Sequence, residues 1–173
     1  IARFHALFEP LLFDVVRLPA PDRRRGDASL HLARLEETLE QRHEELAAIV
    51  IEPLVQGAAG MIMQPAGYLR GVRELATRYG VLLIIDETHT ISTGPGGYTR
   101  AYGLEHDLFV MGKPVAGGVP ASVWGFTDEV AQRLTAVRSQ VPPGHSGMGT
   151  TLSANALSLA AMLRRSSAKS CAL

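Results

Sequence analysis

Cysteine, lysine and long apolar runs are all scarce in this chain of 173 residues. Its single cysteine, Cys171, excludes an internal disulfide framework and favours a reducing compartment. No apolar run approaches the roughly 20 residues of a membrane-spanning helix. The formal net charge is zero, which argues against a surface built for nucleic acid or for an anionic membrane. We therefore expect a cytoplasmic globular protein that binds neither nucleic acid nor membrane.

Several motifs of metal and nucleophilic catalysis are also missing. The sequence has no H-E-x-x-H or C-x-x-C spacing, so a metal site built from His89, His106 and His145 is conceivable but lacks a known pattern. It has no G-x-S-x-G elbow either. The basic run 23–25 could bind phosphate, although a short charge run is more often a solvated face. We expect no metal.

Apolar runs and segments with helical spacing alternate along the chain. We expect strands at 13–19, 47–51, 81–85, 108–111 and 122–126, and helices at 29–45, 68–79, 128–137 and 153–163. Ser29 is expected to cap the first helix and Gly80 to end the second. Because the strands are apolar on both faces, the pattern predicts an α/β fold with a mostly parallel sheet and helices on both faces.

Three polar residues follow predicted strands. Lys113, one of only two lysines, lies in a glycine-rich turn after 108–111; Asp86 ends one apolar strand and Glu52 another. Ligands of such sheets bind outside the carboxyl ends of the strands, so we expect the three side chains to converge. A loop amine and a strand-end acid are the pair that a pyridoxal phosphate enzyme uses. A solvated lysine and a structural ion pair at Glu52 are the simpler alternatives.

The segment Asp86-Glu87-Thr88-His89 also matches the DExH box of nucleotidases, in which the acids hold magnesium. That function requires an upstream phosphate loop, G-x-x-x-x-G-K-[ST]. Here Gly112-Lys113 is followed by Pro114, the earlier glycine is replaced by Asp107, and the order is reversed. We keep a DExH-type nucleotidase only as an alternative.

Five ordered segments resemble the class III aminotransferases, which are fold type I pyridoxal phosphate-dependent transferases and include the glutamate-1-semialdehyde aminomutases. They are I-E-P-L-V-Q-G at 51–57, the G-Y-L helix at 67–75, the L-L-I-x-D-E segment at 82–90, G-K-x-x-x-G-G-x-P at 112–120, and H…G-T-T-L-S-A-N at 145–155. The similarity covers nearly all of residues 1–163. Five blocks in order are more specific than any one of them.

The resemblance implies a role for each matching residue. Lys113 would hold pyridoxal 5'-phosphate as a Schiff base and Asp86 would pair with the pyridinium nitrogen. His89 would lie near the phenolic oxygen of the ring, and Glu52 would belong to the substrate side. Thr151 would contact the cofactor phosphate of the partner subunit, which implies a homodimer. The implied reaction is transamination between an amine or amino acid and an oxo acid or aldehyde.

The resemblance also implies that this chain is a fragment. The family's phosphate-cup segment would precede Ile1, and its small C-terminal domain would follow Leu173. We expect residues 1–163 to form part of the pyridoxal phosphate-binding large domain, and 164–173 to be an atypical tail, disordered or frame-shifted. A catalytically inactive truncated remnant is therefore an alternative to an active transaminase.

Overall fold

The structure is a computed structural model that describes residues 6–12, 14–142, 144, 149 and 151–168. Its internal contacts divide the chain into two compact units, residues 1–83 and 84–173. Within the described residues, no helix is long and apolar enough to cross a membrane.

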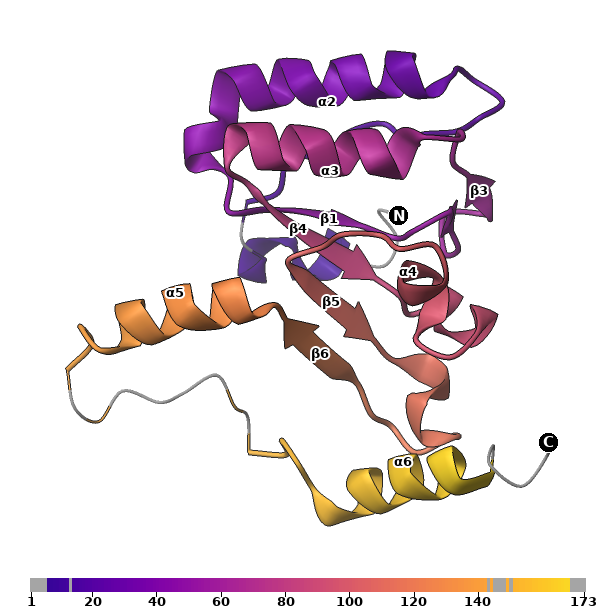
Figure 1. Cartoon of the computed structure of the whole chain (residues 1–173), viewed down its shortest axis with the longest axis vertical. Coiled ribbons are helices and arrows are strands. Elements are labelled where there is room, and N and C mark those ends of the chain that lie inside the picture. The colour runs from indigo at the N-terminus through magenta and orange to yellow at the C-terminus, as the bar shows by residue number, and fades with distance from the viewer. Residues whose placement is uncertain (1–5, 13, 143, 145–148, 150, 169–173) are drawn as a thin grey trace. The chain divides into compact units, whose positions relative to one another are not determined.

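The first unit is built around a pair of helices. Its elements are η1 (Ala6–Leu11), α2 (Ala28–Arg42), η2 (His43–Glu45), β1 (Ala48–Ile51), β2 (Val55–Gln56), β3 (Ile62–Met63) and α3 (Tyr68–Tyr79). Helices α2 and α3 lie side by side (Figure 1). Leu35 and Leu39 of α2, and Val72 and Leu75 of α3, are buried. Their helical spacing gives each helix one apolar stripe, and burying that stripe is what stabilises such a pair.

The second unit contains the strands that position the candidate site. Its elements are β4 (Leu82–Asp86, which begins in the first unit), η3 (Thr90–Thr93), α4 (Gly97–Ala101), β5 (Leu108–Met111), η4 (Lys113–Ala116), β6 (Val123–Phe126), α5 (Asp128–Arg138) and α6 (Ala156–Ala168). The strand order of the sheet is β1-β4-β5-β6. Strand β5 pairs parallel with β4 and antiparallel with β6. The α/β prediction is confirmed, and the sheet is mixed because β6 reverses direction.

Several predicted boundaries are wrong. The described residues of 13–19 form no strand, and Val15 is 49% exposed. Asp27, not Ser29, caps α2, because its Oδ1 accepts the N–H of Leu30 at 3.0 Å. Helix α6 begins three residues later than expected, after Asn155 accepts the N–H of Ser158. It also continues to Ala168, beyond its predicted end at residue 163; the assignment of 164–173 as an atypical tail stays a prediction.

Other elements match the prediction closely. Helix α3 has the predicted bounds, and Gly80 ends it with a φ of 69° while its N–H bonds to the carbonyl of Ala76. Glycine adopts this left-handed conformation without a steric penalty. Strand β4 follows after one residue, so the helix end and the start of the apolar strand are both specified by local sequence.

Candidate active site

The second unit brings Asp86 and Lys113 to the same edge of the sheet. Strands β4 and β5 are parallel neighbours, with Asp86 opposite Val110 in register. Asp86 is the last residue of β4, and Lys113 follows the end of β5 by two residues. The carboxyl ends of parallel strands are where ligands of α/β sheets bind. This part of the sequence prediction therefore agrees with the fold.

Asp86 is half-buried and oriented by its own chain. Its Oδ1 accepts the backbone N–H of Thr88 at 2.9 Å. This local bond is of the kind that lets aspartate fix a turn directly after a strand. Its other carboxylate oxygen has no hydrogen-bond partner among the described residues. Asp86 can therefore accept a further hydrogen bond from a cationic N–H group.

Lys113 occupies an unusual backbone conformation. Its φ of 45° lies in the left-handed region, which residues other than glycine rarely adopt, and such strain clusters at functional sites. Gly112 precedes it and Pro114 follows it within η4. The turn thus sets the direction in which the Cα–Cβ bond of Lys113 leaves the backbone.

The Lys113 amine contacts a single described side chain, His89. The distance between Lys113 Nζ and His89 Nε2 is 3.1 Å. When the amine is protonated, Nε2 must carry no proton and accept the hydrogen bond, because an ammonium group can only donate. Both side chains are exposed. The predicted lysine and the predicted ring neighbour are therefore brought together by η3 and the turn after β5.

Glu87, the neighbour of Asp86, does a different job. It is 1% exposed, and its carboxylate accepts the Thr90 hydroxyl at 2.5 Å and the backbone N–H groups of Thr99 and Tyr98 at 2.5 and 3.3 Å. Such bonds satisfy a buried charge that would otherwise destabilise the fold. A methyl group placed on Gly97 would lie 2.8 Å from Glu87 Oε2.

Three-ligand metal clusters are absent from the described part of the chain. Because Glu87 is turned inward and saturated, the Asp-Glu pair does not present two carboxylates to one ion. This geometry does not support the DExH alternative. Of the histidines considered for a metal, His106 bonds through Nδ1 to the carbonyl of Leu104, and His145 lies outside the described residues.

Glu52 belongs to the first unit, where it follows β1. Its Oε2 accepts the N–H of Gly57 at 3.0 Å, and its backbone carbonyl accepts the side-chain amide of Gln64 at 2.7 Å. These bonds tie the strand end to the β2–β3 hairpin, which the sequence did not predict. The substrate role of Glu52 stays a prediction.

Thr151 lies in an exposed turn, residues 151–154, ahead of α6. Its predicted contact with a cofactor phosphate across a dimer stays a prediction, and the neighbouring Thr150 lies outside the described residues.

Sequence reasoning missed two acid-centred clusters. One is Glu87 with its backbone donors. The other is Asp22, 4% exposed, which accepts both the backbone N–H and the guanidinium of Arg24. The guanidinium of Arg24 holds the pKa of Asp22 at about 2, below its ordinary value of 3.8. An aspartate two residues before an arginine in a proline-rich loop was the available signal for this second cluster.

The residues at the sheet edge fit the expected pyridoxal phosphate in two respects. Lys113 presents a primary amine, and Asp86 keeps an unbonded carboxylate oxygen that suits a ring N–H. An acid at the pyridine nitrogen and a lysine at the aldehyde carbon are the protein groups that this cofactor requires.

The chain belongs to the class-III aminotransferase family, whose model matches residues 2–165. It is 41% identical over 126 residues to the adenosylmethionine-8-amino-7-oxononanoate aminotransferase of Nitratidesulfovibrio vulgaris, a match that covers 66% of this chain and 23% of the relative. The chain thus spans about a quarter of the length of the curated relatives it matches. The resemblance seen in the sequence is confirmed.

Two solved structures show the same fold. A glutamate-1-semialdehyde-aminomutase from Pseudomonas aeruginosa in complex with PMP is 47% identical, with a TM-score of 0.68 over 76% of this chain and 29% of that chain. An (S)-enantioselective omega-transaminase from Thermomicrobium roseum is 30% identical, with a TM-score of 0.78 over 96% of this chain and 39% of that chain. The second match spans both compact units.

Proposed function

We propose that this chain is part of a pyridoxal phosphate-dependent transaminase of the class III type. The observation that supports this most directly is the placement of Asp86 and Lys113 after adjacent parallel strands of one unit, with the Lys113 amine held against His89. The substrates would be an amine or amino acid as donor and an oxo acid or aldehyde as acceptor. Family membership supports this class of substrates.

Each residue would contribute one physical function. Bound pyridoxal phosphate supplies an electron-accepting ring that stabilises negative charge at the substrate carbon bearing the amino group. Asp86 would hold the ring nitrogen protonated by accepting its N–H. Lys113 Nζ would anchor the cofactor and, when free, move a proton between the substrate Cα and the cofactor C4′. His89 would lie near the phenolic oxygen.

The remaining parts of the proposal concern the whole assembly. Thr151 would contact the phosphate of the partner subunit in a homodimer, and Glu52 would face the substrate. A cytoplasmic location is proposed from the single cysteine, because reducing compartments keep thiols free.

The decisive experiment is covalent labelling of Lys113. The chain is incubated with pyridoxal phosphate, reduced with borohydride and digested, and the modified lysine is identified by mass spectrometry. We expect a pyridoxyl group on Lys113 and little on Lys169, which is the only other lysine and so serves as the internal control. Equal labelling of both lysines indicates nonspecific reaction, and no Lys113 label in a version that includes the flanking family segments refutes the proposal.

Turnover separates an active transaminase from the inactive remnant. The chain alone and the longer version are assayed for amino transfer from a panel of amino acids and amines to pyruvate. Labelling of Lys113 without turnover in either version supports the remnant. Turnover of about one per second or more, which is ordinary for enzymes, supports the transaminase.

A further inference from the structure

The first unit contains a cavity of about 450 Å³, which is lined by none of the residues assigned to pyridoxal phosphate or its substrate but by Arg24 and Arg25 of the basic run 23–25. Small-molecule sites occupy about 300–1,000 Å³, so the cavity has a suitable size. Its lining joins the loop after residue 18 to the first turns of α2 and to the tip of the β2–β3 hairpin. The residues that matter for its chemistry are Asp22, Arg24, Arg25, His31, Arg34 and Gly60.

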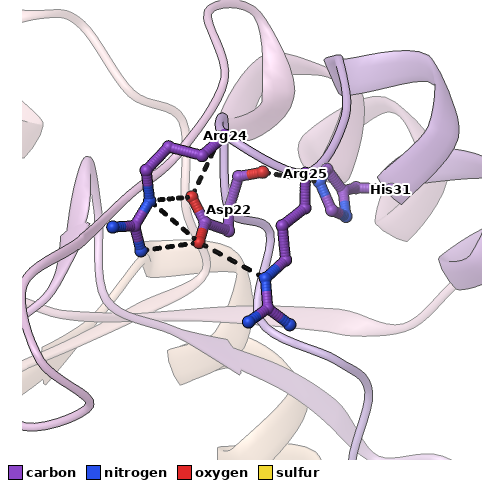
Figure 2. A network of polar contacts seen from close by, with 4 residues as sticks. All are labelled: Asp22, Arg24, Arg25 and His31. Atoms are coloured by element: carbon purple, nitrogen blue, oxygen red, sulfur yellow. Dashed lines mark hydrogen bonds and ion pairs between the residues drawn. The ribbon is translucent and has the colours of Figure 1, made fainter.

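The only carboxylate in this lining, Asp22, is already occupied. Its Oδ1 accepts the backbone N–H of Arg24 at 2.9 Å, and its Oδ2 accepts Nη2 of the same residue at 2.8 Å. Arg25 approaches Oδ2 only to 3.8 Å through Nε. Figure 2 shows both arginine side chains reaching the same carboxylate. One acid therefore faces two arginines, and it is saturated mainly by the first.

A third arginine, Arg34, lines the cavity without any carboxylate of its own. It lies one helical turn after His31 on α2, a spacing that places both residues on one face of the helix. The guanidinium of Arg34 has no hydrogen bond or ion pair with any residue that the structure describes. Three guanidinium groups against one carboxylate leave the lining with an excess of positive charge.

His31 adds an unused polar atom beside these charges. It is 5% exposed, and its Nε2 lies 3.2 Å from the carbonyl oxygen of Asp22, so Nε2 carries the proton and donates it. Its Nδ1, an acceptor in this tautomer, is buried and has no partner within the described residues, so it can take a hydrogen bond from a water or from the O–H of a hydrogen phosphate, but not from a bare oxyanion. Buried polar atoms are normally hydrogen-bonded, and one that is not calls for an explanation such as an unseen water or ligand.

We propose that this cavity binds a small molecule that carries an oxyanion, a phosphate or a carboxylate, with Arg34 and Arg25 as its cationic partners. Guanidinium groups match both oxyanions through paired N–H donors. Gly60 adds room on the hairpin side, since a methyl group placed there would meet nothing within 4 Å. The cavity lining contains none of the residues proposed to hold pyridoxal phosphate, and this inference does not depend on the proposed transaminase function.

The test titrates the 173-residue chain with inorganic phosphate and with citrate at constant ionic strength, using sodium chloride as the reference. Binding is followed by calorimetry and by the backbone amide signals of Asp22, Arg25 and Gly60. We expect saturable binding of at least one oxyanion, and the stronger of the two identifies the chemical group. Loss of one charged hydrogen-bond partner in Arg34→Met should weaken it about tenfold.

The matched control is Arg70→Met, an exposed helical arginine of the same unit that does not line the cavity. It should bind like the wild-type chain. Equal weakening in both variants, or signals that move as much with chloride, shows a nonspecific ionic effect and overturns the proposal. If Arg34→Met fails to fold by circular dichroism, the amide signals of the wild-type chain decide, and their failure to respond to either anion rejects the site.

Discussion

Two neighbouring carboxylates at the end of β4, those of Asp86 and Glu87, differ in burial and in hydrogen bonding. Glu87 is buried and accepts three hydrogen bonds from Thr90, Tyr98 and Thr99. Asp86 is half-buried and accepts one, from Thr88, with an oxygen left over. The period of two along a strand sends adjacent side chains to opposite faces. A saturated acid stabilises the fold, whereas an acid with unused capacity can hold a ligand.

The segment that contacts Glu87 and the turn that contains Lys113 differ in the same way. Glu87 anchors the segment that begins at Gly97, where bulk is excluded by the carboxylate itself. Lys113 instead lies in a strained turn, exposed, with its amine against His89. Glu87, which is buried and fully hydrogen-bonded, therefore has a structural role at this strand edge. Lys113, in a strained turn, and Asp86, with an unused acceptor oxygen, have the features expected of a ligand-binding site.

The largest expected effect is at Lys113. Replacing it with glycine removes the amine, so covalent capture of pyridoxal phosphate at this position should vanish. The free energy of unfolding should stay within about 1 kcal/mol of wild type, because glycine tolerates the positive φ that strains lysine. Borohydride trapping and urea denaturation measure the two effects. A large loss of stability would mean that Lys113 is a structural residue.

Glu87→Ala should give the reverse result. It removes the acceptor of two backbone N–H donors, one of them buried, and of one buried hydroxyl, so the free energy of unfolding should fall by about 3 kcal/mol or more. Asp86→Ala removes a single half-buried acceptor and should lower it by less than about 1.5 kcal/mol. Urea denaturation of both variants side by side gives the comparison. Equal losses in the free energy of unfolding would show that Asp86 and Glu87 contribute alike to the stability of the fold.

Local sequence signals predict the helices and strands around β4, but they do not predict which groups bind Glu87. The apolar run of β4, the Gly80 helix end and the order of Asp86 before Lys113 are all visible in sequence. The partners of Glu87 are backbone N–H groups 11 and 12 residues away, and every residue except proline has such a donor. Residue type does not distinguish the N–H groups of Tyr98 and Thr99 from any others, so only the structure shows that they bind Glu87.

The failed strand at 13–19 shows a related limit. Its alternation is real in the sequence, yet a strand also needs a neighbour that accepts its hydrogen bonds. The described residues of this segment pair with no strand and are largely exposed. Alternation specifies a face; pairing depends on residues elsewhere in the chain.

A substitution at His89 tests the proposed cofactor site around Lys113 more finely. If it mainly holds the Lys113 amine, His89→Phe should slow covalent capture of pyridoxal phosphate about tenfold, the effect of losing one hydrogen bond to a charged group. Binding of 4-deoxypyridoxine phosphate, which cannot react with an amine, should then be unchanged. Equal weakening of both would assign His89 to the ring instead. His106→Gln is the control, because the His106 ring contacts the Leu104 carbonyl and Phe109 rather than Lys113.

The smallest expected effect concerns Asp22, the saturated acid of the first unit. Arg24 lowers its pKa to about 2 from an ordinary 3.8, so the folded chain favours the ionised form. That contribution to stability is complete above pH 4 and is lost as the pH falls toward 2. Exposed arginine side chains face solvent, which screens the pair and keeps the effect small. Asp22→Asn should therefore flatten the dependence of unfolding on pH between 4 and 2, measured by urea denaturation. An unchanged slope would show that saturation at Asp22, unlike that at Glu87, adds nothing to the fold.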